Sequence, residues 1–207
     1  MNMANDLGFI HRFVPGKDIG RAPLLLLHGS GGDEHDLLPL AERIAPGRAL
    51  VSPRGKVNEQ GITRFFRRAP DGTWDIDDFQ FRTGELAGFL RSARGAYGLP
   101  KPIALGYSNG ANIGWSPLLK EPGALAGAIL LRAMLPFDPR PLPDLRGIPV
   151  LLIAGHYDEL IPVDRAGLLA AMLGEAGADV TYEVLHAGHG LTPEDLKLAS
   201  EWLVSRR

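Results

Sequence analysis

The serine of a G-x-S-x-G motif, Ser108, is the residue of this chain whose type and spacing point most clearly to chemistry. Residues 106–110 read GYSNG, a G-x-S-x-G motif that follows an apolar run at 103–105 and precedes a segment with helical character. A strand, a sharp turn and a helix form the context in which this motif presents a serine nucleophile. We expect a positive φ at Ser108, with Gly106 and Gly110 facing each other where the strand and the helix approach closely.

A serine hydroxyl is a weak nucleophile at neutral pH, so Ser108 requires a general base and an acidic residue that orients the base. These partners follow the serine in the order Asp or Glu, then His. Asp158 comes shortly after the apolar run 150–154, at the carboxyl end of an expected strand. Glu159 and Asp144 are alternatives for this role, but Asp158 lies nearest to the strand end.

Two histidines follow the next expected strand, at residues 180–184, and either could be the general base. We prefer His189 to His186 because Gly188 and Gly190 allow the backbone to project the His189 side chain. The two histidines could also begin a metal site, yet no further ligands follow at a recognisable spacing. The sequence therefore predicts a Ser-Asp-His triad, with no metal and no cofactor.

A glycine-rich loop supplies a pocket for the negatively charged oxygen of a tetrahedral intermediate. Residues 24–27 are four leucines, which is typical of a buried parallel strand, and they lead into the sequence HGSGG. The backbone N–H groups of such a loop are free to point inward. We expect the amides of Ser30 and Asn109 to form this oxyanion hole.

Aromatic residues gather in the long irregular segment 53–78, and long loops of this kind are often functional. They could form an apolar wall for the substrate, or a small core that fixes the segment. Neighbours of the predicted triad could also line the site. The candidate pocket residues are Phe65, Phe66, Trp74, Tyr107 and Leu160.

Strands and helices alternate along the chain, which indicates a mostly parallel, doubly wound sheet flanked by helices. The expected strands cover residues 9–14, 24–27, 49–52, 103–106, 126–131, 150–154 and 180–184. One helix should begin near Asp36 and another should include residues 86–93. The last should start at the capping sequence 192–195 and end near residues 206–207. Because no repeat or linker divides the chain, we expect residues 1–207 to form one domain.

Composition narrows the class of protein. A chain of 207 residues with 45% hydrophobic content can bury a substantial core. A formal net charge of −2 gives no reason to expect a nucleic-acid partner, and the apolar runs are too short to span a bilayer. The N-terminal residues lack the features of an export signal and there is no cysteine, so we expect a cytoplasmic protein without disulfides.

Several segments together resemble a known family. LLLLHGSGGDEHDLLPLA, SPRG, FFRR, GYSNGAN, GHYDELIP and HAGHGLTPED are similar to sequences of the α/β-hydrolase superfamily. Within it, the chain most resembles the lidless phospholipase/carboxylesterase family, which includes the acyl-protein thioesterases. The resemblance covers nearly the whole chain and implies an α/β-hydrolase fold without a lid domain. It also implies Ser108, Asp158 and His189 as the triad, with oxyanion amides from Ser30 and Asn109.

The resemblance favours the bacterial carboxylesterase branch, because many thioesterases of the family carry Leu and Gln where this chain has Ser30 and Asn109. We expect a serine carboxylesterase that hydrolyses short- to medium-chain or aromatic carboxylic esters through an acyl-enzyme. The alternatives are an acyl-thioesterase or lysophospholipase, or a hydrolase-fold protein that binds a ligand without turnover. The expected partner is a small-molecule ester, and the sequence is compatible with a homodimer.

Overall fold

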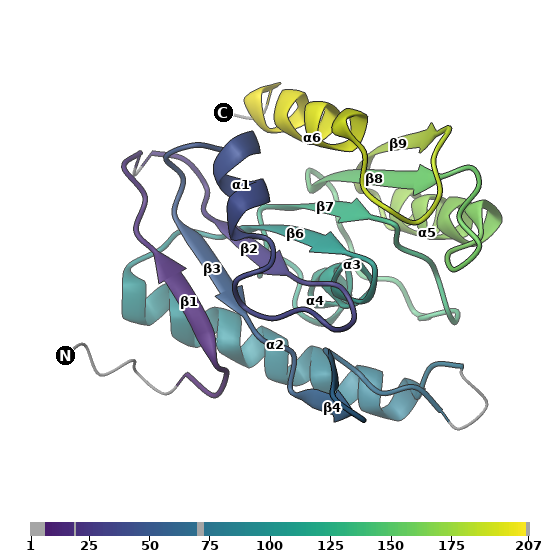
Figure 1. Cartoon of the computed structure of the whole chain (residues 1–207), viewed down its shortest axis with the longest axis horizontal. Coiled ribbons are helices and arrows are strands. Elements are labelled where there is room, and N and C mark those ends of the chain that lie inside the picture. Colours follow the sequence, from purple (N-terminus) through teal and green to yellow (C-terminus); the bar gives the residue numbers. More distant parts are fainter. Residues whose placement is uncertain (1–6, 19, 70–72, 206–207) are drawn as a thin grey trace.

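A seven-stranded sheet forms the centre of the computed structural model, which describes residues 7–18, 20–69 and 73–205 (Figure 1). Its strands are β1 (His11–Val14), β2 (Leu24–Leu27), β3 (Leu50–Pro53), β6 (Ile103–Tyr107), β7 (Gly127–Leu131), β8 (Pro149–Gly155) and β9 (Asp179–Leu185). The spatial order is β1-β3-β2-β6-β7-β8-β9, and every pairing except β1 with β3 is parallel. The predicted sheet is confirmed, with each strand end within two residues of its expected position.

Helices cover both faces of this sheet. They are α1 (Leu38–Ile44), α2 (Ile76–Tyr97), α3 (Asn109–Gly114), α4 (Ser116–Lys120), α5 (Val163–Glu175) and α6 (Pro193–Ser205). Figure 1 shows α1 and α6 above the sheet and the long α2 below it. None of the helices in the described part of the chain has the length and apolar content that a membrane span needs.

The four leucines of β2 show why this strand reads as one apolar run. Leu24 and Leu26 belong to the core under α1 and α6, whereas Leu25 and Leu27 belong to the core shared with α2 to α5. All four side chains are 0% exposed. Because successive side chains of a strand point to opposite faces, a strand covered on both sides has no polar position.

The predicted helix starts are confirmed. Helix α1 begins at Leu38, two residues after the expected position, with proline in its first turn. Before α6, the backbone N–H of Thr192 donates to the Asp195 carboxylate at 2.7 Å and the Asp195 N–H donates to the Thr192 hydroxyl at 3.4 Å. This is the reciprocal pattern of a capping box. The helix extends to Ser205, and the expected end at residues 206–207 lies outside the described residues.

A short hairpin was not expected from the sequence. Strands β4 (Val57–Glu59) and β5 (Ile62–Arg64) pair antiparallel, and the two turn residues between them, Gln60 and Gly61, have φ values of 53° and 87°. Two positive φ values in succession suit the right-handed twist of a two-residue hairpin. Three-residue strands are too short to give an alternation of apolar and polar residues, which is why the sequence did not indicate them.

The loop aromatics pack into the main core. Phe65, Phe66 and Trp74 are 3%, 1% and 7% exposed. The Phe66 ring centroid lies 4.6 Å from that of Trp74 and 5.0 Å from that of Phe79 on α2. Of the two interpretations of this segment, the structure supports packing for Phe65 and Phe66, because both rings lie in the core, where burial removes a large apolar area from water.

Replacement of Phe66 by alanine should therefore lower the free energy of unfolding by about 3–5 kcal/mol, since it leaves a cavity among packed rings. Urea denaturation followed by circular dichroism measures this change. Phe81 on α2 is the matched control, because its ring is 61% exposed and Phe81→Ala should change stability by no more than about 0.5 kcal/mol. Equal losses in the two variants would contradict the assignment of Phe66 to the core.

Candidate active site

Ser108 occupies the sharp turn between β6 and α3. Its φ of 52° and ψ of −116° confirm the expected strained backbone. The Ser108 N–H donates to the carbonyl of Leu131 at 2.9 Å, which fixes the turn to the end of β7. A Cβ on Gly106 would lie 2.6 Å from the carbonyl oxygen of Gly110, so the two glycines face each other as expected.

Gly110 makes a second close approach that the sequence did not reveal. A Cβ at this position would lie 2.0 Å from the carbonyl oxygen of Leu27 and 2.5 Å from that of His28. Real Cβ atoms do not tolerate such distances, so only glycine permits α3 to pack against the end of β2. This contact places the segment that carries Ser108 beside the glycine-rich loop.

The structure brings Ser108, His189 and Asp158 together in one hydrogen-bonded series. His189 Nε2 lies 2.9 Å from Ser108 Oγ, and His189 Nδ1 lies 2.9 Å from Asp158 Oδ2 and 3.1 Å from Oδ1. The Asp158 side chain is fully buried, while that of His189 is 22% exposed. A carboxylate can only accept, so Nδ1 carries the proton and the Nε2 lone pair faces the serine hydroxyl.

Backbone amides fix the orientation of the Asp158 carboxylate. Its Oδ1 accepts the N–H groups of Leu160 and Ile161, each at 2.9 Å. These bonds come from the loop that follows β8, the strand that Asp158 was expected to follow. The Asp158 carboxylate is thus hydrogen-bonded by these two amides and by His189. A buried charge needs such hydrogen bonds because it has lost those to water.

The other candidates for the acid and the base lie elsewhere. Glu159 and Asp144 are exposed, and Asp144 pairs with Arg146. His186 is also exposed, and its ring stacks near that of His156 with centroids 5.7 Å apart. No group of three or more potential metal ligands occurs within the described ranges.

The glycine-rich loop leaves two amides available for an anion. Within the described residues, no hydrogen bond uses the backbone N–H of Ser30 or that of Asn109. The side chains of both residues are instead held by the segment after β4. Asn109 Oδ1 accepts the N–H of Phe65 at 2.7 Å, and Ser30 Oγ accepts from Arg64 Nε at 3.2 Å.

His28 supports this loop as a neutral, buried imidazole. Its Nε2 accepts the N–H of Gly55 at 2.9 Å, so the proton lies on Nδ1, which donates to the Gly29 carbonyl at 2.7 Å. Burial is the largest influence on this group and lowers the pKa of His28 below its ordinary value of 6.5; the Gly29 bond and nearby carboxylates act in the opposite direction. Protonation of Nε2 would remove the only acceptor for the Gly55 N–H on this ring.

Two of the predicted pocket residues line a pocket of about 460 Å³ at the same edge of the sheet. Trp74 and Leu160 form part of its wall, and Leu160 is also bonded through its N–H to Asp158. The remaining wall includes Ile76, Met134 and Leu135, with Arg68 and Arg165. Among the described residues that line it there is no acidic side chain.

Tyr107 contacts the histidine loop and does not line this pocket. Its hydroxyl donates to the carbonyl of His189 at 3.1 Å, and the two ring centroids are 5.4 Å apart. Burial, its largest influence, raises the pKa of Tyr107, so the hydroxyl keeps its proton for this bond.

Arg132, which was not expected from the sequence, also binds this loop, and its side chain is 0% exposed. Its only sequence signal is a charge placed directly after five apolar strand residues.

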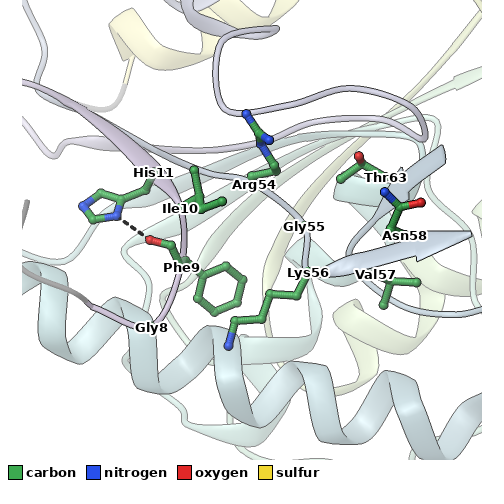
Figure 2. Close-up of a pocket in the computed structure, with 10 residues that line it drawn as sticks. All are labelled: Gly8, Phe9, Ile10, His11, Arg54, Gly55, Lys56, Val57, Asn58 and Thr63. Atoms are coloured by element: carbon green, nitrogen blue, oxygen red, sulfur yellow. Dashed lines mark hydrogen bonds between the residues drawn. The ribbon is translucent and has the colours of Figure 1, made fainter. Parts of the chain in front are cut away.

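A larger hollow of about 700 Å³ lies between the start of β1 and residues 54–58, and Figure 2 shows the side chains around it. No triad residue lines this hollow or the pocket beside Leu160, but the latter is connected to the triad by the Leu160 N–H, which donates to Asp158. The hollow's longest cationic side chains already have partners, since Arg54 binds Glu34 and Lys56 binds Glu85. The pocket at the carboxyl edge of the sheet, beside Ser108, His189 and Asp158, is therefore the better candidate for a substrate site.

Known proteins share both the sequence and the fold of this chain, although no family model matches it. MhqD, a protein of Bacillus subtilis (strain 168) whose name places it among hydrolases, is 42% identical over 181 residues, or 86% of this chain and 90% of the relative. The crystal structure of the Bacillus cereus carboxylesterase is 41% identical, with a TM-score of 0.92 and coverage of 95% and 94%. A carboxylesterase from Mesorhizobium loti is 37% identical, with a TM-score of 0.90 and coverage of 97% and 96%.

The lowered pKa of His28 predicts a loss of stability in mild acid. In the unfolded chain the His28 side chain binds a proton near pH 6.5, whereas in the folded chain it binds this proton only at a lower pH. The contribution of neutral His28 is therefore complete above this value and is lost as the pH falls below it, by at most about 1.4 kcal/mol per pH unit. Urea denaturation between pH 8 and pH 5 measures the slope.

The His28→Leu variant should show a smaller loss over the same pH range, whatever its stability at pH 8. His186→Ala is the control, since this exposed ring makes no contact with the glycine-rich loop. An unchanged slope in His28→Leu would show that another group causes the acid sensitivity.

Proposed function

Since the chain belongs to the phospholipase/carboxylesterase family of the α/β-hydrolase superfamily and is an ester-hydrolysing enzyme, we propose that it is a serine carboxylesterase. The observation that carries this proposal is the hydrogen-bonded series from Asp158 through His189 to Ser108. Each member of it stands at hydrogen-bond distance from the next, as nucleophilic catalysis by serine requires.

The proposed reaction begins when His189 Nε2 removes the proton from Ser108 Oγ as this oxygen attacks the ester carbonyl. Asp158 accepts from Nδ1 and stabilises the imidazolium that forms. The free amides of Ser30 and Asn109 donate to the oxyanion, which lowers the energy of the tetrahedral intermediate. His189 then protonates the leaving alcohol, and a water activated by the same nitrogen hydrolyses the acyl-enzyme.

The pocket beside Leu160 is our proposed binding site for the variable part of the ester. Most of the residues that line it are apolar, and at about 460 Å³ it suits a short or medium acyl chain or an aromatic ring. Arg68 and Arg165 also lie in its wall.

Two other activities use related machinery. A thioesterase would need the same triad, and only a comparison of esters with thioesters separates it from a carboxylesterase. A ligand-binding protein without turnover has no need for a histidine at 2.9 Å from a serine hydroxyl. The alignment of all three groups therefore favours catalysis over binding alone.

We expect Ser108→Ala to reduce ester hydrolysis by about a million-fold, because the nucleophile and the function of its base are lost together. A fluorophosphonate probe followed by peptide mass spectrometry should label the wild-type chain at Ser108 and leave the variant unlabelled. Labelling of a different residue would rule out the proposed nucleophile.

The two histidines provide a matched comparison. His189→Ala should lose nearly all activity, while His186→Ala, which removes an exposed ring on the same loop, should keep most of it. The opposite result would mean that the general base is His186.

Chain-length preference tests the pocket. A buried methylene contributes about 0.8 kcal/mol, so kcat/KM on p-nitrophenyl esters should rise with each added carbon until the pocket is full and then fall. Leu160→Ala should shift the position of this maximum and change hydrolysis of the acetate much less. Leu160 is 67% exposed, so stability should remain within about 0.5 kcal/mol of the wild type.

Phe81→Ala is the control for this experiment, since Phe81 is exposed and does not line the pocket. A maximum that stays fixed in Leu160→Ala would place the variable part of the ester elsewhere. A rate that keeps rising to long chains would favour a lipid or an acylated protein as substrate.

A further inference from the structure

Side chains from other parts of the fold bind three consecutive carbonyl oxygens around His189. Arg132 Nε donates to the Gly188 carbonyl at 3.0 Å, and Arg132 Nη2 donates to the Gly190 carbonyl at 3.2 Å. Between them, the Tyr107 hydroxyl donates to the carbonyl of His189 itself. Residues 186–192 connect β9 to α6 and belong to neither element. Their backbone position therefore depends on bonds of this kind rather than on a strand ladder.

Arg132 uses all of its hydrogen-bonding capacity in this position. A guanidinium has five N–H donors, and two of them bind the carbonyls beside His189. The remaining donors bind the Asp195 carboxylate at 2.7 Å and 3.0 Å and the Ile153 carbonyl at 3.3 Å. Both charged side chains of this pair are 0% exposed. A guanidinium so completely enclosed and bonded has one position only.

Asp195 connects the guanidinium to the start of α6. One carboxylate oxygen, Oδ2, accepts from Arg132 and also from the N–H and hydroxyl of Thr192, at 2.7 Å and 2.8 Å. The histidine loop is thus held at its middle by Arg132 and at its end by Asp195. Arg132 also has a positive φ of 60°, an uncommon backbone state that persists where surrounding bonds impose it.

We propose that Arg132 is a positioning residue for the reaction, which rests on the proposed triad. Its two hydrogen bonds, to the carbonyls on either side of His189, fix the position of the imidazole relative to Ser108, with Nε2 2.9 Å from Oγ. Arg132 does not touch the reacting atoms. It acts through the backbone of residues 188–190, and a displacement of about 1 Å there is enough to cost about 100-fold in rate.

Arg48 provides a matched control for the test. It is also buried, at 4% exposed, and donates to two backbone carbonyls, those of Ala22 and Leu203, at 2.8 Å and 3.1 Å. It makes no hydrogen bond to the histidine loop. Arg48→Met and Arg132→Met each remove a buried guanidinium that donates to backbone carbonyls, but only the second also removes bonds from the histidine loop and the ion pair with Asp195.

Steady-state kinetics on a short p-nitrophenyl ester, at a temperature where each variant is folded, make the comparison. We expect Arg132→Met to lower kcat by about 100-fold with KM within about threefold of the wild type. The rate of fluorophosphonate labelling should fall in parallel, because it also depends on His189. Arg132→Lys keeps the charge opposite Asp195 but offers three donors in place of five, so its kcat should be intermediate. Arg48→Met should keep the kcat of the wild type.

If Arg132→Met does not fold, Arg132→Lys and Asp195→Asn give the same comparison with Arg48→Met. Folded Arg132 variants with the kcat of Arg48→Met would overturn the positioning role while leaving the triad in place. An absence of labelling at Ser108 in the wild type would instead refute the proposed function. The two failures are therefore distinguishable in one set of measurements.

Discussion

The close contact between Gly110 and the end of β2 is the constraint on which the candidate site depends. The backbone of α3 lies so near the carbonyls of Leu27 and His28 that no other residue type fits. This contact joins the strand that leads into the glycine-rich loop to the helix that follows the serine. Ser30 and Asn109 therefore belong to one rigid unit, although 79 positions separate them in the sequence. The parallel order of β2, β6, β7 and β8 then places the remaining groups at the same edge.

Polar side chains at this edge order the loops by accepting backbone N–H groups. Asp158 accepts from the loop after β8, Asn109 accepts from Phe65, and Asn112 Oδ1 accepts from Met134 at 2.9 Å. Each of these loops lacks regular secondary structure, so its amides need partners from elsewhere. The same residues that stand near the proposed chemistry thus also replace the hydrogen bonds that a strand or helix would supply. Replacement of one of these side chains would therefore disturb the loop that it binds as well as remove the side chain from the site.

The sequence predicts those features that depend on neighbouring residues. The strand before Ser108, its positive φ and the capping box before α6 are local patterns, and each is confirmed. The position of Phe66 depends on α2, which follows later in the chain, so apolar character alone could not separate core from pocket. Arg132 is the extreme case, because its partner lies 63 residues away. A lone arginine after a strand is usually a surface residue, and only the folded chain shows it to be enclosed.

The anchoring of His189 through carbonyl oxygens has an evolutionary consequence. Every amino acid has the same backbone carbonyl, so the hydrogen bonds from Arg132 do not depend on which side chains the loop carries. Position 187 can therefore change while the histidine keeps its place. The loop backbone in turn restricts position 155 to glycine, because a Cβ there would lie 2.5 Å from the Gly188 carbonyl oxygen. New substrate preferences can arise in such a loop by substitution of its side chains, under a backbone that remains fixed.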